Sequence, residues 1–404
     1  MTDPATTDPL VLRAARLLDG TGAPPVADAA LLVESGRIAY AGPATGLPER
    51  AASLPSRDFP RGTLLPGLVD VHVHLVASGG PDLAADVPKT EAERTMAAVA
   101  NARRQLDQGV TLVRDLGSPG AEAVVVGRAV EAGTIAGPRV VASGPAVTMT
   151  GGHIAYIGRV SDGPDDMRTA VRANLALGAR CIKVVATGGV LTMGIDPREP
   201  AYTQPELDAL VQEAHRLGLT VAAHAIGEGG VAAALRAGVD SVEHGMFLDD
   251  AAIELFLATG ARYTPTFSAP RGILGGPSVP AWIKDRARPA AEAQVTSFLA
   301  AVEAGVPTVA GTDAGTPDNP HGGVARELAF MVEAGLDVLL AVRAATAEAA
   351  DLLRVPDRGV LRRGAAADVL VAAGDVTADV AVLQHPVAVF QDGRQVAGAP
   401  GAQA

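Results

Sequence analysis

The stretch LALGARCIKVVATGG, residues 175–189, contains the pattern that decides the fold of this chain. A helical segment ends at Gly178, where a left-handed residue commonly terminates a helix, and an apolar run follows at once. Val184 and Val185 mark this run as a strand buried on both faces, which is typical of a parallel sheet. The same succession returns six times along the chain, in QLDQGVTLVRDL, EAGTIAGPRVVAS, HRLGLTVAAHA, LRAGVDSVEHG, LATGARYTPT and VEAGVPTVAGTDAG.

These seven units follow another strand-like segment, LLPGLVDVHVHL, so the chain offers eight strands, most of them alternating with helices. Eight such units are the plan of a (β/α)₈ TIM barrel, which has about 250 residues before insertions. An open, doubly wound sheet is the alternative, but no G-x-G-x-x-G turn follows the first strand. We therefore predict an α/β fold with a (β/α)₈ barrel over residues 63–355.

The two ends of the chain have a different pattern. Residues 1–62 contain short strand-like pieces such as ALLVESG and RIAYAG, and residues 356–404 contain PVAVFQDG and RQVAG. Neither segment is long enough to form a stable sheet domain by itself. We expect the two segments to pair into a small β-sandwich that flanks the barrel.

Composition and charge exclude several classes of protein. The net charge of −12 is made of scattered signs without a basic stripe, which argues against a nucleic-acid partner. No apolar run approaches the ~18 uncharged residues of a membrane span. The first residues, MTDPATTDPL, lack the basic and apolar regions of a secretory leader, and Cys181 is the single cysteine. We expect a cytoplasmic protein without a membrane partner.

Potential metal ligands lie near the carboxyl ends of the predicted strands. His72 and His74 are two residues apart in VDVHVHL, so both side chains point to the same face of one strand. Taken singly, each candidate would fit a structural role equally well. In a barrel, however, the strand ends meet at one mouth, where active sites lie, so their convergence predicts a metal centre. The candidate ligands are His72, His74, Lys183, His224, His244 and Asp313.

Lys183 is unusual because it is one of only three lysines among 33 basic residues and stands inside a buried strand. A buried ammonium is costly and has no lone pair for a metal. Its amine can instead add CO₂ to form a carbamate, whose two oxygens can each bind one ion of a pair. An arginine, with a pKa above about 12, is far less able to do so.

Two other classes remain open at this point. A Schiff-base lyase would also place a lysine on a barrel strand, but it has no use for four histidines and an aspartate. A non-catalytic binding barrel would be expected to lose one ligand or the acid, and here every position is filled.

The motifs PGLVDVHVHL, TGGH at residues 150–153, IKVVATGGV, VAAHAIG, DSVEHG and GTDAG resemble those of the amidohydrolase superfamily. Within it, the chain resembles prolidase-like and imidazolonepropionase-like metal-dependent hydrolases. The resemblance implies two divalent ions, Zn²⁺ or else Mn²⁺ or Fe²⁺, and hydrolysis of an amide C–N bond by a hydroxide between them. One ion would be held by His72, His74 and Asp313, the other by His224 and His244, with the Lys183 carbamate as bridge and Asp313 as proton relay.

The substrate is less well defined by the sequence. The resemblance implies that His153 in TGGH contacts the substrate, and His321 in NPHGG is predicted to lie on the same face. Ile226 stands where dipeptide-cleaving relatives often have a tyrosine, which weakens the case for a dipeptide. We expect a homo-oligomer acting on a small molecule: a dipeptide of the Xaa-Pro type or an N-acyl amino acid, with a cyclic amide, an ester or a carbamate as alternatives.

Overall fold

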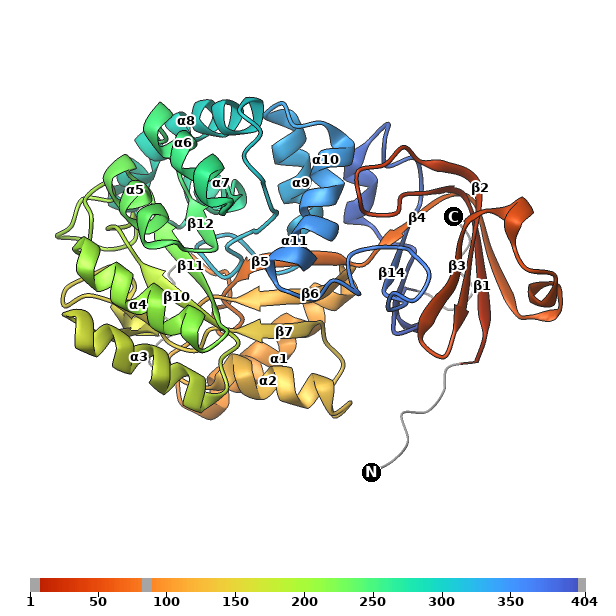
Figure 1. Ribbon diagram of the computed structural model, residues 1–404, viewed down its shortest axis with the longest axis horizontal. Coiled ribbons are helices and arrows are strands. Elements are labelled where there is room, and N and C mark those ends of the chain that lie inside the picture. The colour runs from red at the N-terminus through yellow and green to blue at the C-terminus, as the bar shows by residue number, and fades with distance from the viewer. Residues whose placement is uncertain (1–7, 82–88, 399–404) are drawn as a thin grey trace.

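The computed structural model describes residues 8–81 and 89–398. Figure 1 shows a body of strands surrounded by helices, with a smaller sheet at one end that contains both terminal segments. No helix in the described parts of the chain combines the length and low charge that a membrane span requires.

Among the described residues, the larger body contains nine strands in two sheets, and every pairing within them is parallel. The first sheet has the order β5-β6-β7, with β5 (Leu68–Val73), β6 (Val110–Asp115) and β7 (Arg139–Ala142). The second has the order β13-β12-β11-β10-β8-β9, with β8 (Ala146–Thr148), β9 (Gly158–Val160), β10 (Cys181–Val185), β11 (Thr220–Ala225), β12 (Ser241–His244) and β13 (Arg262–Thr264).

Helices follow most of these strands. They are α1 (Glu91–Asp107), α2 (Glu122–Glu131), α3 (Pro164–Leu177), α4 (Gln204–Arg216), α5 (Glu228–Ala237), α6 (Asp250–Thr259), α7 (Ser268–Gly275), α8 (Ala281–Glu303), α9 (Val324–Glu333), α10 (Val338–Ala344) and α11 (Ala347–Leu352). Short 3₁₀ helices are η1 (Ala44–Gly46), η2 (Glu49–Ser53), η4 (Ala155–Ile157) and η5 (Val380–Gln384).

Local chemistry explains where the helices begin and end. The Thr90 hydroxyl and the Glu93 carboxylate cap the start of α1 reciprocally, which satisfies backbone N–H groups that have no partner within the helix. The predicted terminating glycines all adopt positive φ, a region that L-residues with side chains rarely occupy. These are Gly109, Gly133, Gly178, Gly218, Gly238, Gly260 and Gly305.

Backbone hydrogen bonds join the two parallel sheets on both sides. Residues 307–314, the eighth predicted strand, lie between β13 and β5 but form an irregular segment, since Pro307 lacks an N–H and Asp313 has φ 55°. The named strands therefore form two sheets, while the predicted parallel α/β arrangement is confirmed. The joining bonds are Arg180 N to Ala142 O (2.9 Å), Tyr263 N to Pro307 O (2.8 Å) and Val71 N to Ala310 O (3.1 Å).

In their described parts, the two terminal segments share one sheet of seven strands, and the predicted pairing of the two ends is thus present. A second sheet facing it is not found in the described parts of these segments, so the predicted sandwich is present only as this shared sheet. β4 continues from it directly to β5 (Figure 1), and the predicted domain boundaries stay predictions. The order is β16-β15-β14-β4-β1-β2-β3, with β1 (Leu10–Leu17), β2 (Val26–Glu34), β3 (Arg37–Pro43), β4 (Ser56–Pro66), β14 (Val369–Ala372), β15 (Ala388–Gln391) and β16 (Arg394–Ala397).

Candidate metal centre

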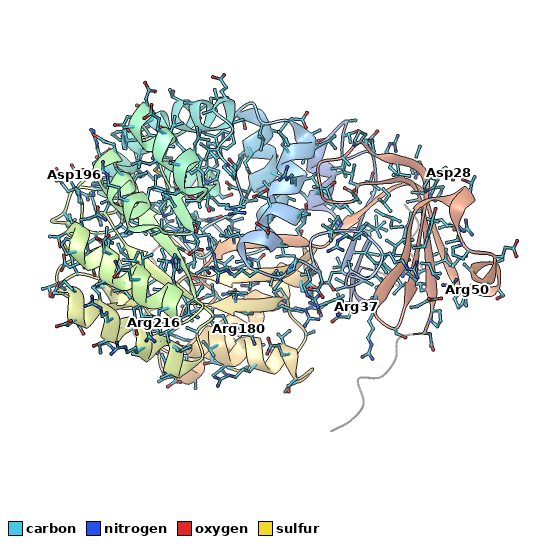
Figure 2. All side chains as sticks on the ribbon, viewed as in Figure 1. Asp28, Arg37, Arg50, Arg180, Asp196 and Arg216 are labelled. Atoms are coloured by element: carbon cyan, nitrogen blue, oxygen red, sulfur yellow. The ribbon has the colours of Figure 1, made fainter. Side chains whose placement is uncertain are left out.

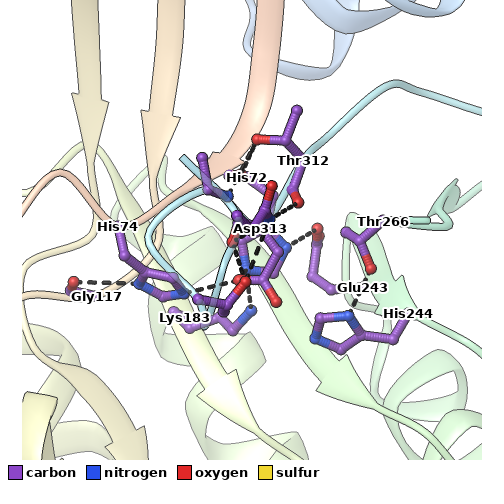
Figure 3. Close-up of polar contacts among 12 residues, drawn as sticks. His72, His74, Gly117, Lys183, Glu243, His244, Thr266, Thr312 and Asp313 are labelled. Carbon is purple, nitrogen blue, oxygen red and sulfur yellow. Dashed lines mark hydrogen bonds and ion pairs between the residues drawn. The ribbon is translucent and has the colours of Figure 1, made fainter. Parts of the chain in front are cut away.

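The structure brings all six predicted metal ligands to one cavity at the carboxyl ends of the parallel strands. His72 is in β5, His74 directly follows that strand, and Asp313 belongs to the irregular segment 307–314. The remaining three come from β10, β11 and β12 (Figure 3 labels Lys183 and His244). Each is at most 7% exposed: His72, His74, Lys183, His224, His244 and Asp313.

Several polar side chains of this cluster are in direct contact with one another. Asp313 Oδ1 is 3.3 Å from His72 Nε2 and 3.1 Å from His74 Nε2. Lys183 Nζ is 3.3 Å from His72 Nε2. Ligand atoms of His72, His244 and Asp313 all lie within 4.8 Å of one another, a spacing at which they could hold one metal ion. Burying so many polar groups together, away from water, is expected of a ligand site rather than of a core.

In three of the histidines, a hydrogen bond at Nδ1, which points away from the cluster, determines that Nε2 is the nitrogen that faces the cluster. In each ring Nδ1 is engaged by an acceptor, so the lone pair is left on Nε2, as metal-binding histidines require. The three contacts are His72 Nδ1 to Glu243 Oε2 (3.0 Å), His74 Nδ1 to Gly117 O (3.3 Å) and His244 Nδ1 to Thr266 Oγ1 (2.7 Å).

His224 is arranged differently from the other three histidines. Its Nε2 lies 2.9 Å from the Gly188 carbonyl oxygen, which leaves Nδ1 as the nitrogen without a backbone partner. Its ring centroid is 4.6 Å from that of His244, so the two rings are close enough to act on a common ligand.

Burial and neighbouring charges place the ionisable groups in states suited to a divalent cation. Burial, and then the charge of Lys183, lowers the pKa of His72 to about 4, so its imidazole is neutral at pH 7. Burial alone would raise the pKa of Asp313, but its electrostatic interactions with His72 and His74 outweigh this effect and hold the pKa below its usual value. Burial lowers the pKa of Lys183 to about 8. The donor set of neutral imidazoles and an ionised carboxylate fits Zn²⁺ and related ions.

Strained backbone occurs at the ends of the strands that carry the cluster. His244 has φ 75° and Asp313 has φ 55°, and Thr266, which contacts His244, has φ 55°. A left-handed conformation in a residue other than glycine costs about 1–3 kcal/mol and persists where the surrounding contacts require it. Here it turns the two ligand side chains toward the cavity.

Several supporting residues escaped the sequence analysis. Glu243 bonds His72 and pairs with Arg114, and the carboxylate of Asp70 accepts hydrogen bonds from the backbone and hydroxyl of Thr312. The sequence contains part of the evidence for these two residues, because a carboxylate within a buried strand needs a partner. The partners themselves are distant in sequence and were not predictable from spacing.

The two histidines predicted to contact substrate lie in different places. His153 lines the cavity, with Nδ1 2.9 Å from Thr192 Oγ1 and its ring centroid 4.8 Å from that of His224. His321 is not among the residues that line this cavity, because its Nε2 is held 3.0 Å from the Ala77 carbonyl oxygen. The structure therefore does not place His321 in the wall of this cavity.

Beyond the six candidate ligands, the cavity walls are almost entirely apolar. Among the described residues, the exceptions are His153 and Thr316. The apolar lining consists of Ile154, Ile157, Val190, Leu191, Ile226, Met246, Ala269, Pro270, Ile273, Ala287 and Ala290.

Comparison with known proteins identifies the family. The profile of the amidohydrolase family matches residues 63–396. Ochratoxinase of Aspergillus niger is 32% identical over 415 residues, which cover 94% of this chain and 84% of the fungal protein. A solved Xaa-Pro dipeptidase with methionine bound in its active site superposes with a TM-score of 0.90 at 31% identity, covering 96% of this chain and 100% of the dipeptidase. A prolidase complexed with N-methylphosphonate-L-proline gives 0.88 at 28% identity, covering 96% and 99%. The chain therefore belongs to the amidohydrolase family and is a hydrolase that acts on carbon–nitrogen amide bonds.

Proposed function

We propose that this chain is a metal-dependent amidohydrolase that cleaves the amide bond of an N-acyl amino acid or of a dipeptide of the Xaa-Pro type. One observation carries the proposal: six buried candidate ligands share one cavity, and three of the histidines present Nε2 with their Nδ1 atoms already engaged. The family generally uses divalent metal ions, and this donor set fits them.

We assign two divalent ions to the cavity. His72, His74 and Asp313 would hold one, and His224 and His244 the other. Lys183, as a carbamate, would bridge the pair. Zn²⁺ is the ion that imidazole and carboxylate ligands favour, and Mn²⁺ or Fe²⁺ would also fit. When bound, such ions supply a water nucleophile of lowered pKa and polarise the substrate carbonyl.

The residues of the chain have separate tasks in this proposal. Asp313 is an ionised carboxylate lining the cavity, so it can accept the proton of the attacking water and deliver it to the leaving nitrogen. His153 lines the same cavity beside His224 and would contact the substrate. Glu243 holds His72 in the orientation that directs Nε2 to the metal.

The apolar walls favour a substrate with a bulky apolar group. Ile226 and Met246, together with Ile154 and Ile157, would remove such a group from water, which is worth roughly 25 cal/mol for each Å² of apolar surface buried. The likeness to ochratoxinase and to a Xaa-Pro dipeptidase supports an amide substrate. Because Ile226 stands where dipeptide-cleaving relatives often have a tyrosine, we favour the N-acyl amino acid over the dipeptide.

Metal analysis followed by a substrate screen tests this function. The purified protein, reconstituted with Zn²⁺ and bicarbonate, should carry close to two ions per chain, and N-acyl amino acids with apolar acyl groups should be hydrolysed faster than Xaa-Pro dipeptides. A metal content that never exceeds one ion per chain would contradict the two-ion assignment. Turnover confined to cyclic amides, esters or carbamates would replace the proposed substrate class.

A further inference from the structure

Two histidines of the cavity each contact a threonine hydroxyl through Nδ1. His153 Nδ1 lies 2.9 Å from Thr192 Oγ1, and His244 Nδ1 lies 2.7 Å from Thr266 Oγ1. A hydroxyl group can donate one hydrogen bond and can also accept. The other partners of each threonine therefore determine which nitrogen of the neighbouring imidazole carries the hydrogen.

Thr266 accepts the hydrogen bond from His244. Its single hydroxyl hydrogen is directed to the carbonyl oxygen of Pro265, at 2.7 Å, so only the oxygen remains for the imidazole. His244 Nδ1 is then the N–H group (Figure 3 shows the contact), and the lone pair stands on Nε2. This is the state that a candidate metal ligand requires.

Thr192 has the opposite arrangement. It lies in the loop that follows β10 and reaches the surface at Asp196 (Figure 2). Its Oγ1 accepts from the backbone N–H of Ile154 at 3.4 Å, and among the described residues the only acceptor for its hydrogen is His153 Nδ1. The reverse direction would leave the hydroxyl hydrogen without a partner in the described chain, which is unfavourable in a half-buried site. The hydrogen of a neutral His153 then stands on Nε2.

The Nε2 atom of His153 is open to the cavity. It has no hydrogen-bond partner among the described residues, and it is not one of the buried polar atoms that are closed to a water-sized group. The faces of the ring are packed: a Cβ built on Gly189 would lie 2.3 Å from Nε2 and 2.4 Å from Cδ2, and the His224 ring centroid is 4.8 Å away. An Nε2–H group cannot bind a metal ion, but it can donate to an oxygen atom of a bound molecule.

We propose that Thr192 is a positioning residue whose hydroxyl donates to His153 Nδ1 and thereby makes Nε2–H a hydrogen-bond donor to an oxygen of the substrate. The inference rests on the proposed function, because the N-acyl amino acid supplies that oxygen. The two threonines thus give two histidines of one cavity opposite tautomers, so that His244 is prepared for a metal ion and His153 for the substrate.

The tautomer can be measured without substrate. Long-range ¹H–¹⁵N spectra of the full chain, labelled with ¹⁵N-histidine and reconstituted with Zn²⁺ and bicarbonate, distinguish the protonated from the unprotonated ring nitrogen. The His153 signals are those that disappear in His153→Leu. In the parent and in Thr192→Ser the hydrogen should be on Nε2, and in Thr192→Val, which lacks the hydroxyl, this preference should be lost.

Kinetics test whether Thr192 acts through His153. Thr192→Val should lower kcat/KM for an N-acyl amino acid by about 5- to 100-fold, the range for a buried polar group that loses its partner. Thr192→Ser should stay near the parent. In a His153→Leu background the same Thr192→Val change should alter kcat/KM by less than about 2-fold. The metal content of all variants should equal that of the parent. Thr169→Val, which removes an exposed hydroxyl of α3, is the control.

Three results would overturn this assignment. The first is a hydrogen on Nδ1 of His153 in the parent. The second is an equal loss from Thr192→Val with and without His153, which would mean that Thr192 only supports its loop. The third is a loss of metal in His153→Leu, which would make His153 a metal ligand. A parent protein that hydrolyses no amide would contradict the proposed function instead, and the spectra would still decide the direction of the hydrogen bond between Thr192 and His153.

Discussion

Arg114 and Glu243 form an ion pair that is completely buried beside the candidate metal ligands, with Arg114 Nη2 2.9 Å from Glu243 Oε1 and both side chains 0% exposed. The other carboxylate oxygen of Glu243 lies 3.0 Å from His72 Nδ1 (Figure 3). Burial alone would raise the pKa of Glu243, but the charge of Arg114 and the contact with His72 outweigh it and hold the pKa below its usual value. One ionised carboxylate thus orients a ligand and balances a buried cation.

Glu243→Gln should weaken metal binding by about 10- to 100-fold, the usual effect of losing such a supporting partner. An amide has a single acceptor oxygen, so it cannot accept from both His72 and Arg114, which the carboxylate does with two. Competition with a chelator would measure the affinity, and Glu254→Gln, an exposed glutamate of α6, is the control. Parent-like affinity in Glu243→Gln would show that His72 is oriented by other contacts.

Lys183→Arg should lose metal and activity together, because the guanidinium keeps the charge but cannot readily form a carbamate. Lys183→Ala should lose both as well, yet regain some activity when acetate or propionate at high concentration supplies the missing carboxylate. Metal content and turnover of the two variants are the measurements, and Lys284→Arg, in α8, is the control. An active Lys183→Arg protein with a full complement of metal would exclude the carbamate, and a borohydride-trapped adduct of substrate on Lys183 would support a Schiff base instead.

Asp313→Asn should reduce turnover by at least about 10²-fold, the scale of general acid–base contributions. The amide retains an oxygen that can contact a metal, but it cannot accept and release a proton at neutral pH. Activity should therefore fall further than metal content, and both are to be measured on the same sample. Near-parent turnover per bound metal would remove Asp313 from the proton relay.

We expect Glu327 to give the fold a pH dependence that is separate from the cluster of candidate metal ligands. Its carboxylate accepts hydrogen bonds from Phe267 N and Ser268 N, both at 2.7 Å, yet burial raises its pKa from 4.5 to about 7. Between these two values the unfolded chain releases a proton that the folded chain keeps. Glu327 therefore contributes most to the free energy of unfolding below pH 4.5. Between pH 4.5 and pH 7 this contribution falls by an amount on the order of 3 kcal/mol.

Glu327→Gln should remove this dependence, because glutamine does not titrate. The measured quantity is the melting temperature of the metal-free parent minus that of the metal-free variant. This difference should be larger at pH 5 than at pH 7.5. Differential scanning calorimetry at the two pH values measures the difference. A difference that does not change with pH would mean that Glu327 titrates alike in the folded and unfolded chain.

The sequence by itself determined the parallel α/β body and the set of candidate ligands. Both follow from short-range rules: a left-handed glycine such as Gly178 ends a helix, an apolar run such as that of β10 forms a buried strand, and parallel strands present their carboxyl ends together. His72 and His74, two residues apart, could therefore be assigned to one site without knowledge of any long-range contact.

The tertiary structure decided what local spacing cannot encode. Arg114 pairs with Glu243, which lies 129 residues later in the sequence. His321 contacts the carbonyl oxygen of Ala77, 244 residues earlier in the chain, and does not line the cavity. The predicted eighth strand is an irregular segment, in which Asp313 has φ 55° and contacts His72 and His74. In each case the deciding quantity is the partner of a buried polar group, and packing, not sequence spacing, selects that partner.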